Sequence, residues 1–120
     1  MLTKIEEQLK TGTIKNVTYF GSGIQFQPPY VVIKQEKDPV GRGTIFRIIA
    51  HFQGLQIDWL DNYLEVEVID LLNGFKIITS KGNYNQLMVD DYSDIVITND
   101  DLTISKEMIF LMPGMAISNL

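Results

Sequence analysis

The fold of this chain is decided by residues 28–52, which read PPYVVIKQEKDPVGRGTIFRIIAHF. Two runs rich in β-branched and aromatic residues, Tyr30–Gln35 and Thr44–Gln53, flank a polar segment that contains a proline and two glycines. The two prolines at the start disfavour a helix. The stretch therefore predicts a long β-hairpin whose loop, residues 34–43, projects from the sheet and is free to contact a neighbour.

The second arm of this hairpin is apolar on much of both faces, so we expect a central, covered strand. One face carries Ile45, Arg47, Ile49 and His51, and the other carries Phe46, Ile48, Ala50 and Phe52.

Before the hairpin, Leu2, Ile5 and Leu9 recur at helical spacing and Gly12 follows them, which predicts a short amphipathic helix. Residues 13–20 are rich in β-forming residues and predict a first strand.

After the hairpin, the apolar period becomes helical, which predicts a helix that begins near Ile57. Asp58 is the expected N-cap residue, and Gly74 is the expected residue just beyond the end. The acidic outer face is expected to be solvated. The apolar stripe consists of Ile57, Leu60, Leu64, Val68 and Leu71, and the acidic face of Asp61, Glu65 and Asp70.

The last third of the sequence returns to strand patterns separated by turn residues. The predicted strands are Phe75–Thr79, Gln86–Val89, Tyr92–Thr98 and Glu107–Met112. The order of elements predicts a single α+β domain over residues 1–120, with a mostly antiparallel sheet, a long projecting hairpin and two helices packed on one face.

Composition excludes several kinds of chemistry. The chain has no cysteine and one histidine, His51, so it offers no disulfide, no thiolate nucleophile and no histidine-rich metal cluster. Neither glycine pair, Gly21/Gly23 or Gly41/Gly43, has the surroundings of a phosphate-binding loop. We therefore expect no catalytic residue, no cofactor and no metal.

Charge is distributed unevenly. Residues 1–50 carry seven lysines and arginines against four acids, whereas residues 51–120 carry three against eleven. Nucleic acid is a poor partner for such a chain, because phosphate binding needs a concentrated basic face. Head-to-tail association of copies would use the asymmetry, although sequence halves need not be spatial halves.

Two acidic clusters, one at residues 90–94 and one at residues 100–101, are candidate metal sites. Neither has the spacing of a calcium loop, so we expect them to be solvated turns and strand ends. They form the predicted acidic surface of Asp90, Asp91, Asp94, Asp100 and Asp101.

The N-terminus lacks the apolar run of a signal peptide, and no apolar run reaches the roughly 20 residues that span a bilayer. We therefore expect a soluble protein, cytoplasmic where it is made. The C-terminal stretch, residues 108–117, is apolar beyond Pro113, so Met112, Met115 and Ile117 are candidate interface residues, with folding back over the sheet as the alternative.

Several of these stretches, taken in order, resemble the tail-terminator and related neck (tail-completion) proteins of tailed bacteriophages. They are the short first helix, Pro-Tyr-Val-Val-Ile at 29–33, Phe-Arg-Ile-Ile-Ala-His-Phe at 46–52 and the helix around residues 61–72. The resemblance covers residues 1–72. It implies a virion protein, a ring and most simply a hexamer, that caps the tail tube and joins it to the head connector, with an acidic lumen through which DNA passes without specific binding.

Our leading hypothesis is therefore a non-catalytic structural protein whose hairpin loop contacts the next subunit. The residues expected at that contact are Lys34, Lys37, Asp38 and Arg42. A second hypothesis is a small cytoplasmic module that binds a peptide or ligand between helix and sheet. A third is an enzyme that uses carboxylates from residues 90–101.

Overall fold

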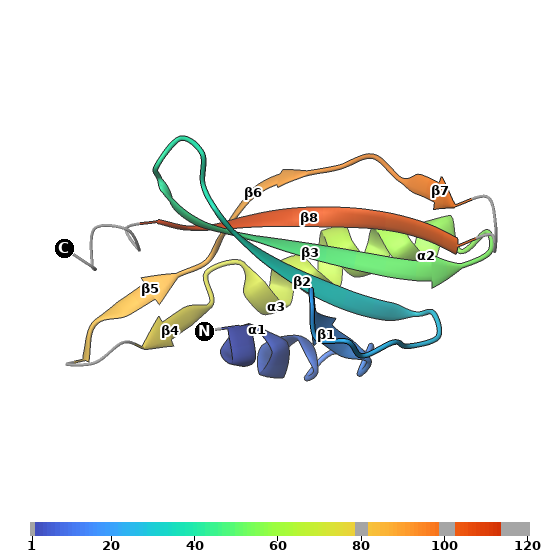
Figure 1. Ribbon diagram of the computed structural model, residues 1–120, viewed down its shortest axis with the longest axis horizontal. Coiled ribbons are helices and arrows are strands. Elements are labelled where there is room, and N and C mark those ends of the chain that lie inside the picture. Colours follow the sequence, from blue (N-terminus) through green and yellow to red (C-terminus); the bar gives the residue numbers. More distant parts are fainter. Residues whose placement is uncertain (1, 79–81, 99–102, 114–120) are drawn as a thin grey trace.

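The computed structural model describes residues 2–78, 82–98 and 103–113. Figure 1 shows the arrangement of the helices and strands along the chain. They are α1 (Leu2–Leu9), β1 (Val17–Tyr19), β2 (Tyr30–Lys37), β3 (Gly43–Gln53), α2 (Ile57–Asn62), the π-helix η1 (Tyr63–Val68), α3 (Ile69–Leu72), β4 (Lys76–Ile78), β5 (Tyr84–Gln86), β6 (Met88–Tyr92), β7 (Val96–Thr98) and β8 (Thr103–Pro113).

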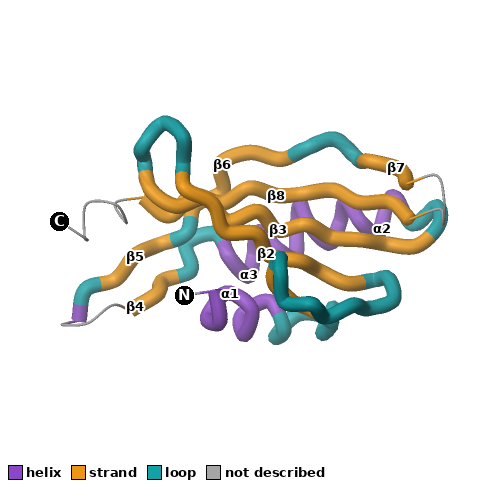
Figure 2. The backbone as a smooth tube through the Cα atoms, in the orientation of Figure 1, coloured by secondary structure: helices purple, strands orange, loops and turns teal. Residues whose placement is uncertain are grey.

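The main sheet has the strand order β1-β2-β3-β8-β6. β6 pairs with residues 108–111 of β8, and β7 pairs with residues 103–105 along the same edge of β8. All these pairs are antiparallel except β1 with β2, which is parallel. β8 pairs with β3 over its whole length, from Thr103 to Pro113. The final strand is therefore longer and more central than the predicted Glu107–Met112. The predicted hairpin is confirmed (Figure 2), but its loop is shorter than the predicted residues 34–43, because β2 continues to Lys37 and only residues 38–42 lie between the strands.

The helices cover one face of the sheet, which confirms the predicted α+β architecture (Figure 1). Alternate residues of β3 and β8 meet the helices and are buried, and each large apolar side chain stabilises the fold by roughly 1.5–3 kcal/mol. These are Phe46, Ile48, Ala50 and Phe52 from β3, Ile104, Met108, Phe110 and Met112 from β8, and Leu60, Tyr63, Leu64 and Val68 from the helical segment.

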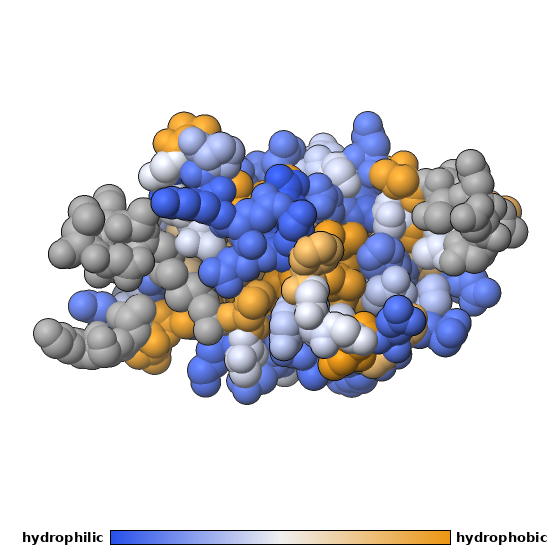
Figure 3. Space-filling model, viewed as in Figure 1, coloured by the Kyte–Doolittle hydropathy of each residue, from blue (hydrophilic) through white to orange (hydrophobic). Residues whose placement is uncertain are grey.

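The opposite face of β2, β3 and β8 is a mixture of polar and apolar side chains (Figure 3). At its centre, Arg47 donates from Nε to Glu36 at 3.1 Å and from Nη1 to Glu107 at 2.8 Å. The hydrogen bond from Arg47 lowers the pKa of Glu36 below its ordinary value. These ion pairs connect the three strands across the uncovered face.

The second helix differs from its prediction at both its start and its middle. Gln56, not Asp58, is the N-cap residue, and no side chain caps the first turn. Residues 63–68 form a π-helix, which changes the period within the segment, so that Leu72 is fully buried and Leu71 only partly. Gly74 follows the helix with a φ of 80°, as predicted.

The other strand predictions were partly wrong. The first strand is confined to Val17–Tyr19, and the predicted strand 86–89 is divided between β5 and β6 at the buried Leu87. Likewise, β6 ends at Tyr92 and β7 begins only at Val96. β4 and β5 form a separate two-stranded sheet beside the main one (Figure 1), and Thr79 lies outside the described residues.

Candidate interaction surface

The tip of the β2–β3 hairpin is folded around the carboxylate of Asp38. This side chain is buried, and it accepts hydrogen bonds from the backbone N–H of Arg42 at 2.9 Å and of Val40 at 3.4 Å. The backbone N–H of Asp38 donates to the carbonyl of Gly43 at 3.0 Å. Gly43 is required here, because a Cβ atom would overlap the carbonyl oxygen of Met112 in β8.

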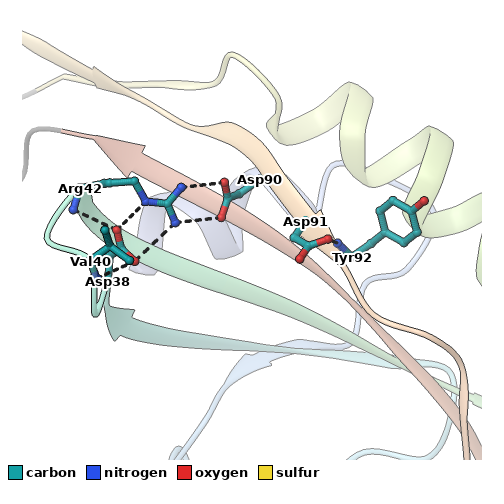
Figure 4. A network of polar contacts seen from close by, with 6 residues as sticks. All are labelled: Asp38, Val40, Arg42, Asp90, Asp91 and Tyr92. Atoms are coloured by element: carbon teal, nitrogen blue, oxygen red, sulfur yellow. Dashed lines mark hydrogen bonds and ion pairs between the residues drawn. The ribbon is translucent and has the colours of Figure 1, made fainter.

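The guanidinium of Arg42 fastens this tip to β6, as Figure 4 shows. Its Nε donates to Asp38 at 2.7 Å, while Nη1 and Nη2 donate to the two oxygens of Asp90 at 3.1 and 3.2 Å. The hydrogen bond from Arg42 lowers the pKa of Asp38, and the two carboxylates raise the pKa of Arg42. We call these three residues the Arg42 clamp.

The other two cations of the predicted contact differ in their surroundings. Lys34 lies 3.3 Å from Glu36 and above the ring of Phe20, with 5.1 Å between Nζ and the ring centroid. Lys37 is exposed and has no ion pair within the described part of the chain. The expectation that the whole loop is free therefore needs correction, because Asp38, Arg42 and Lys34 already have partners in their own chain.

The predicted acidic surface is only partly assembled on β6. Asp90 belongs to the clamp, and Asp91 accepts a hydrogen bond from the backbone N–H of Tyr92 at 2.8 Å. Asp94 is exposed beyond the end of β6. Asp100 and Asp101 lie outside the described residues. No group of three or more histidines or acids in residues 2–78, 82–98 and 103–113 is placed to hold a metal ion.

A buried lysine that the sequence prediction missed lies on β8. Lys106 points from β8 toward the helices and donates to Asp61 at 3.0 Å and to Glu65 at 2.9 Å. Burial alone would lower the pKa of Lys106, but the hydrogen bonds from Lys106 to Glu65 and Asp61 outweigh it and raise that pKa. Two of the three acids expected on a solvated helix face therefore neutralise a core cation.

The alternation Ile104, Lys106, Met108 carried a signal for this residue, since it places the lysine on an apolar face. The signal was missed because the predicted strand began one residue after Lys106.

A groove of about 330 Å³ lies between β6 and the helical segment. Three apolar side chains, one tyrosine and three carboxylates line it. They are Ile69, Val89, Met108, Tyr92, Glu65, Asp90 and Asp91. The groove combines an apolar interior with an acidic rim.

A second hollow, of about 350 Å³, lies under the β1–β2 loop at the other end of β2. Phe20, Phe26 and Tyr30 are among its lining residues, and the ring of Tyr30 stacks on His51 with 4.6 Å between centroids. Burial lowers the pKa of His51.

The predicted C-terminal interface is not confirmed for its first residue. Met112 is fully buried in the hydrophobic core, because β8 continues to Pro113 and turns this side chain inward. It is therefore a core residue. Met115 and Ile117 lie outside the described residues.

No family model matches the chain, and no curated protein matches it. Within the part of the chain that the structure describes, none of the helices has the length and apolar character needed to cross a membrane.

Proposed function

We propose that this chain is a non-catalytic structural protein of a bacteriophage head–tail neck, which forms a ring that ends the tail tube and joins it to the head connector. The observation that carries this proposal is the Arg42 clamp, which fixes a projecting hairpin tip in one conformation. The order of helix, hairpin and helix that resembles the neck proteins is also the order in the fold.

A fixed, projecting tip suits assembly. A ring is built from heterologous contacts, in which one surface of a subunit meets a different surface of the next. Ordering a loop on contact weakens association, and a loop that is folded beforehand avoids this cost. The clamp provides such preorganisation without the help of a partner chain.

The acidic excess supports a role around DNA. The chain carries 15 acids against 10 lysines and arginines, a net charge of −5. Exposed carboxylates in a lumen would repel phosphates, so DNA would pass without specific binding. The partners in this proposal are further copies of the chain, most simply six in all, with the tube protein and the connector, in a virion assembled in the host cytoplasm.

Negative-stain electron microscopy of the purified chain tests this function. Closed rings with a central hole are the expected result. Single particles of monomer size at every concentration would contradict it.

The groove favours a second candidate function, that of a module which binds a peptide or ligand between helix and sheet. Its volume of about 330 Å³ is near the lower end of the range of about 300–1,000 Å³ typical of ligand pockets. A monomer whose groove residues respond to added peptides in NMR spectra would favour this function over the ring.

A further inference from the structure

The groove between β6 and the helical segment has the apolar interior of a docking site. Met108 from β8 and Ile69 from α3 line it together with Val89. Tyr92 lines it from β6 and is 62% exposed, although the Nζ of Lys106 already lies over its ring, 5.4 Å from the centroid. An aromatic ring beside apolar side chains binds the stem of a long cationic side chain well.

The charges around the groove are unbalanced. Three carboxylates line the groove, Glu65, Asp90 and Asp91. Lys106 pairs with Glu65 and Arg42 pairs with Asp90, whereas Asp91 has no cationic partner among the described residues. This unpaired carboxylate is complementary to a cation from outside the chain.

The hairpin tip offers the complementary chemistry. Lys37 is an exposed cation without an ion pair among the described residues, and Val40, three residues further, is 77% exposed. Neither residue contributes to the groove of its own chain. The carboxylate of Asp38 holds the backbone of Val40 (Figure 4), and Lys37 directly precedes Asp38 as the last residue of β2.

We propose that this groove binds the hairpin tip of a second copy, with Val40 against the apolar interior and the Lys37 ammonium between Glu65 and Asp91. The contact is heterologous, since tip and groove are different surfaces. The inference rests on the proposed function, because it names the contact that would join neighbouring subunits of the ring.

Charge reversal in the full-length chain tests the contact. We expect Lys37→Glu and Asp91→Lys each to weaken association by about tenfold or more in analytical ultracentrifugation, a loss typical of close interfacial charge pairs. The double variant K37E/D91K should regain most of the loss, because the pair is restored with its signs exchanged. Lys4→Glu, a reversal at an exposed lysine of α1, is the matched control and should leave association unchanged.

Because the natural chain has no cysteine, a disulfide provides a second readout. Lys37→Cys and Asp91→Cys proteins, mixed under mild oxidation, should form a covalent dimer of the two variants, whereas Lys4→Cys mixed with Asp91→Cys should not. Rings without this cross-link, and with assembly unaffected by the charge reversals, would overturn the inference and leave the proposed function standing. Cross-linked pairs without rings would support the contact and contradict the ring, and monomers without a cross-link would overturn both.

Discussion

Lys106 and Arg42, like Arg47, are each held by two carboxylates, yet the surroundings of Lys106 and Arg42 differ. Lys106 is buried, with 8% of its side chain exposed, between β8 and the acids of the helical segment. Arg42 is 45% exposed and joins the hairpin tip to β6. The first ion-pair group lies inside the packed domain, and the second lies on its surface.

The two ion-pair groups have different roles, one in stability and the other in positioning the hairpin tip. A mostly buried ammonium that loses its carboxylates is left as an uncompensated charge, so its pairing stabilises the fold. An exposed ion pair exchanges with water and contributes little to stability. Its geometry still matters, because a two-pronged guanidinium contact fixes direction as well as distance. Lys106 therefore supports the fold, and Arg42 prepares the tip for contact.

The largest expected effect comes from removing both carboxylates at Lys106. The double variant Asp61→Asn/Glu65→Gln should lower the free energy of unfolding by about 3 kcal/mol, because it leaves a buried charge uncompensated. Urea denaturation followed by circular dichroism measures this loss.

Lys106→Met is the control for that double variant. It removes the charge but keeps an unbranched apolar side chain, and the two acids that remain are partly exposed to water. We expect the unfolding free energy to change by about 1 kcal/mol or less. A loss as large as that of the double variant would show that packing of the lysine stem, and not pairing, supports the fold.

Tyr63 tests whether an unsatisfied buried polar group lowers stability when that group is neutral. Its hydroxyl is buried without a hydrogen-bond partner among the described residues, and burial raises its pKa. Tyr63→Phe removes the unsatisfied oxygen and keeps the ring, so the free energy of unfolding should rise by about 1 kcal/mol. A decrease in thermal melting temperature would contradict this interpretation of the site.

The two ion-pair groups should lose their contributions at opposite ends of the pH scale. The pKa of Lys106 is raised by folding, so its contribution is complete below about pH 10.4 and is lost as pH rises through the folded pKa. The pKa of Asp38 is lowered, so its contribution is present above about pH 3.9 and is lost as pH falls through the folded pKa. In measurements of stability against pH, Lys106→Met should no longer show the loss of stability at alkaline pH. Arg42→Met should show a smaller loss of stability at acid pH than the unmodified chain.

The smallest effect on stability is expected at the clamp itself. Arg42→Met should change the unfolding midpoint much less than the Asp61→Asn/Glu65→Gln double variant, yet it should accelerate hydrogen exchange of the tip amides, residues 40–42. Arg42→Lys should do the same in weaker form, because it keeps the charge but loses the two-pronged contact. Unchanged exchange in both variants would remove the positioning role that we assign to Arg42.

The sequence predicted the local elements well and their long-range pairing poorly. The hairpin, the first helix and the Gly74 end of the second helix follow from period and turn residues within a few positions of each other. The central place of β8 depends on pairing with a strand some 60 residues away, which no local pattern encodes. The π-helix was likewise not predicted, because the apolar pattern of the sequence does not distinguish its wider turns from those of an α-helix.

The same limit applies to the candidate site. The tip residues were found because a polar loop between two β-runs is a local signal, but the pairing of Arg42 with Asp90 joins residues 48 positions apart. The partners of Lys106 lie 45 and 41 positions away. A sequence can therefore indicate which charges are present, while the fold decides which of them remain available to a partner.

The most direct test of the proposed assembly is the molar mass of the unmodified chain in solution, measured by light scattering over a range of protein and salt concentrations. A ring predicts a mass that is a fixed multiple of 13.7 kDa at low salt, with dissociation as salt screens the charged contacts. A mass of 13.7 kDa under all conditions would contradict the proposal.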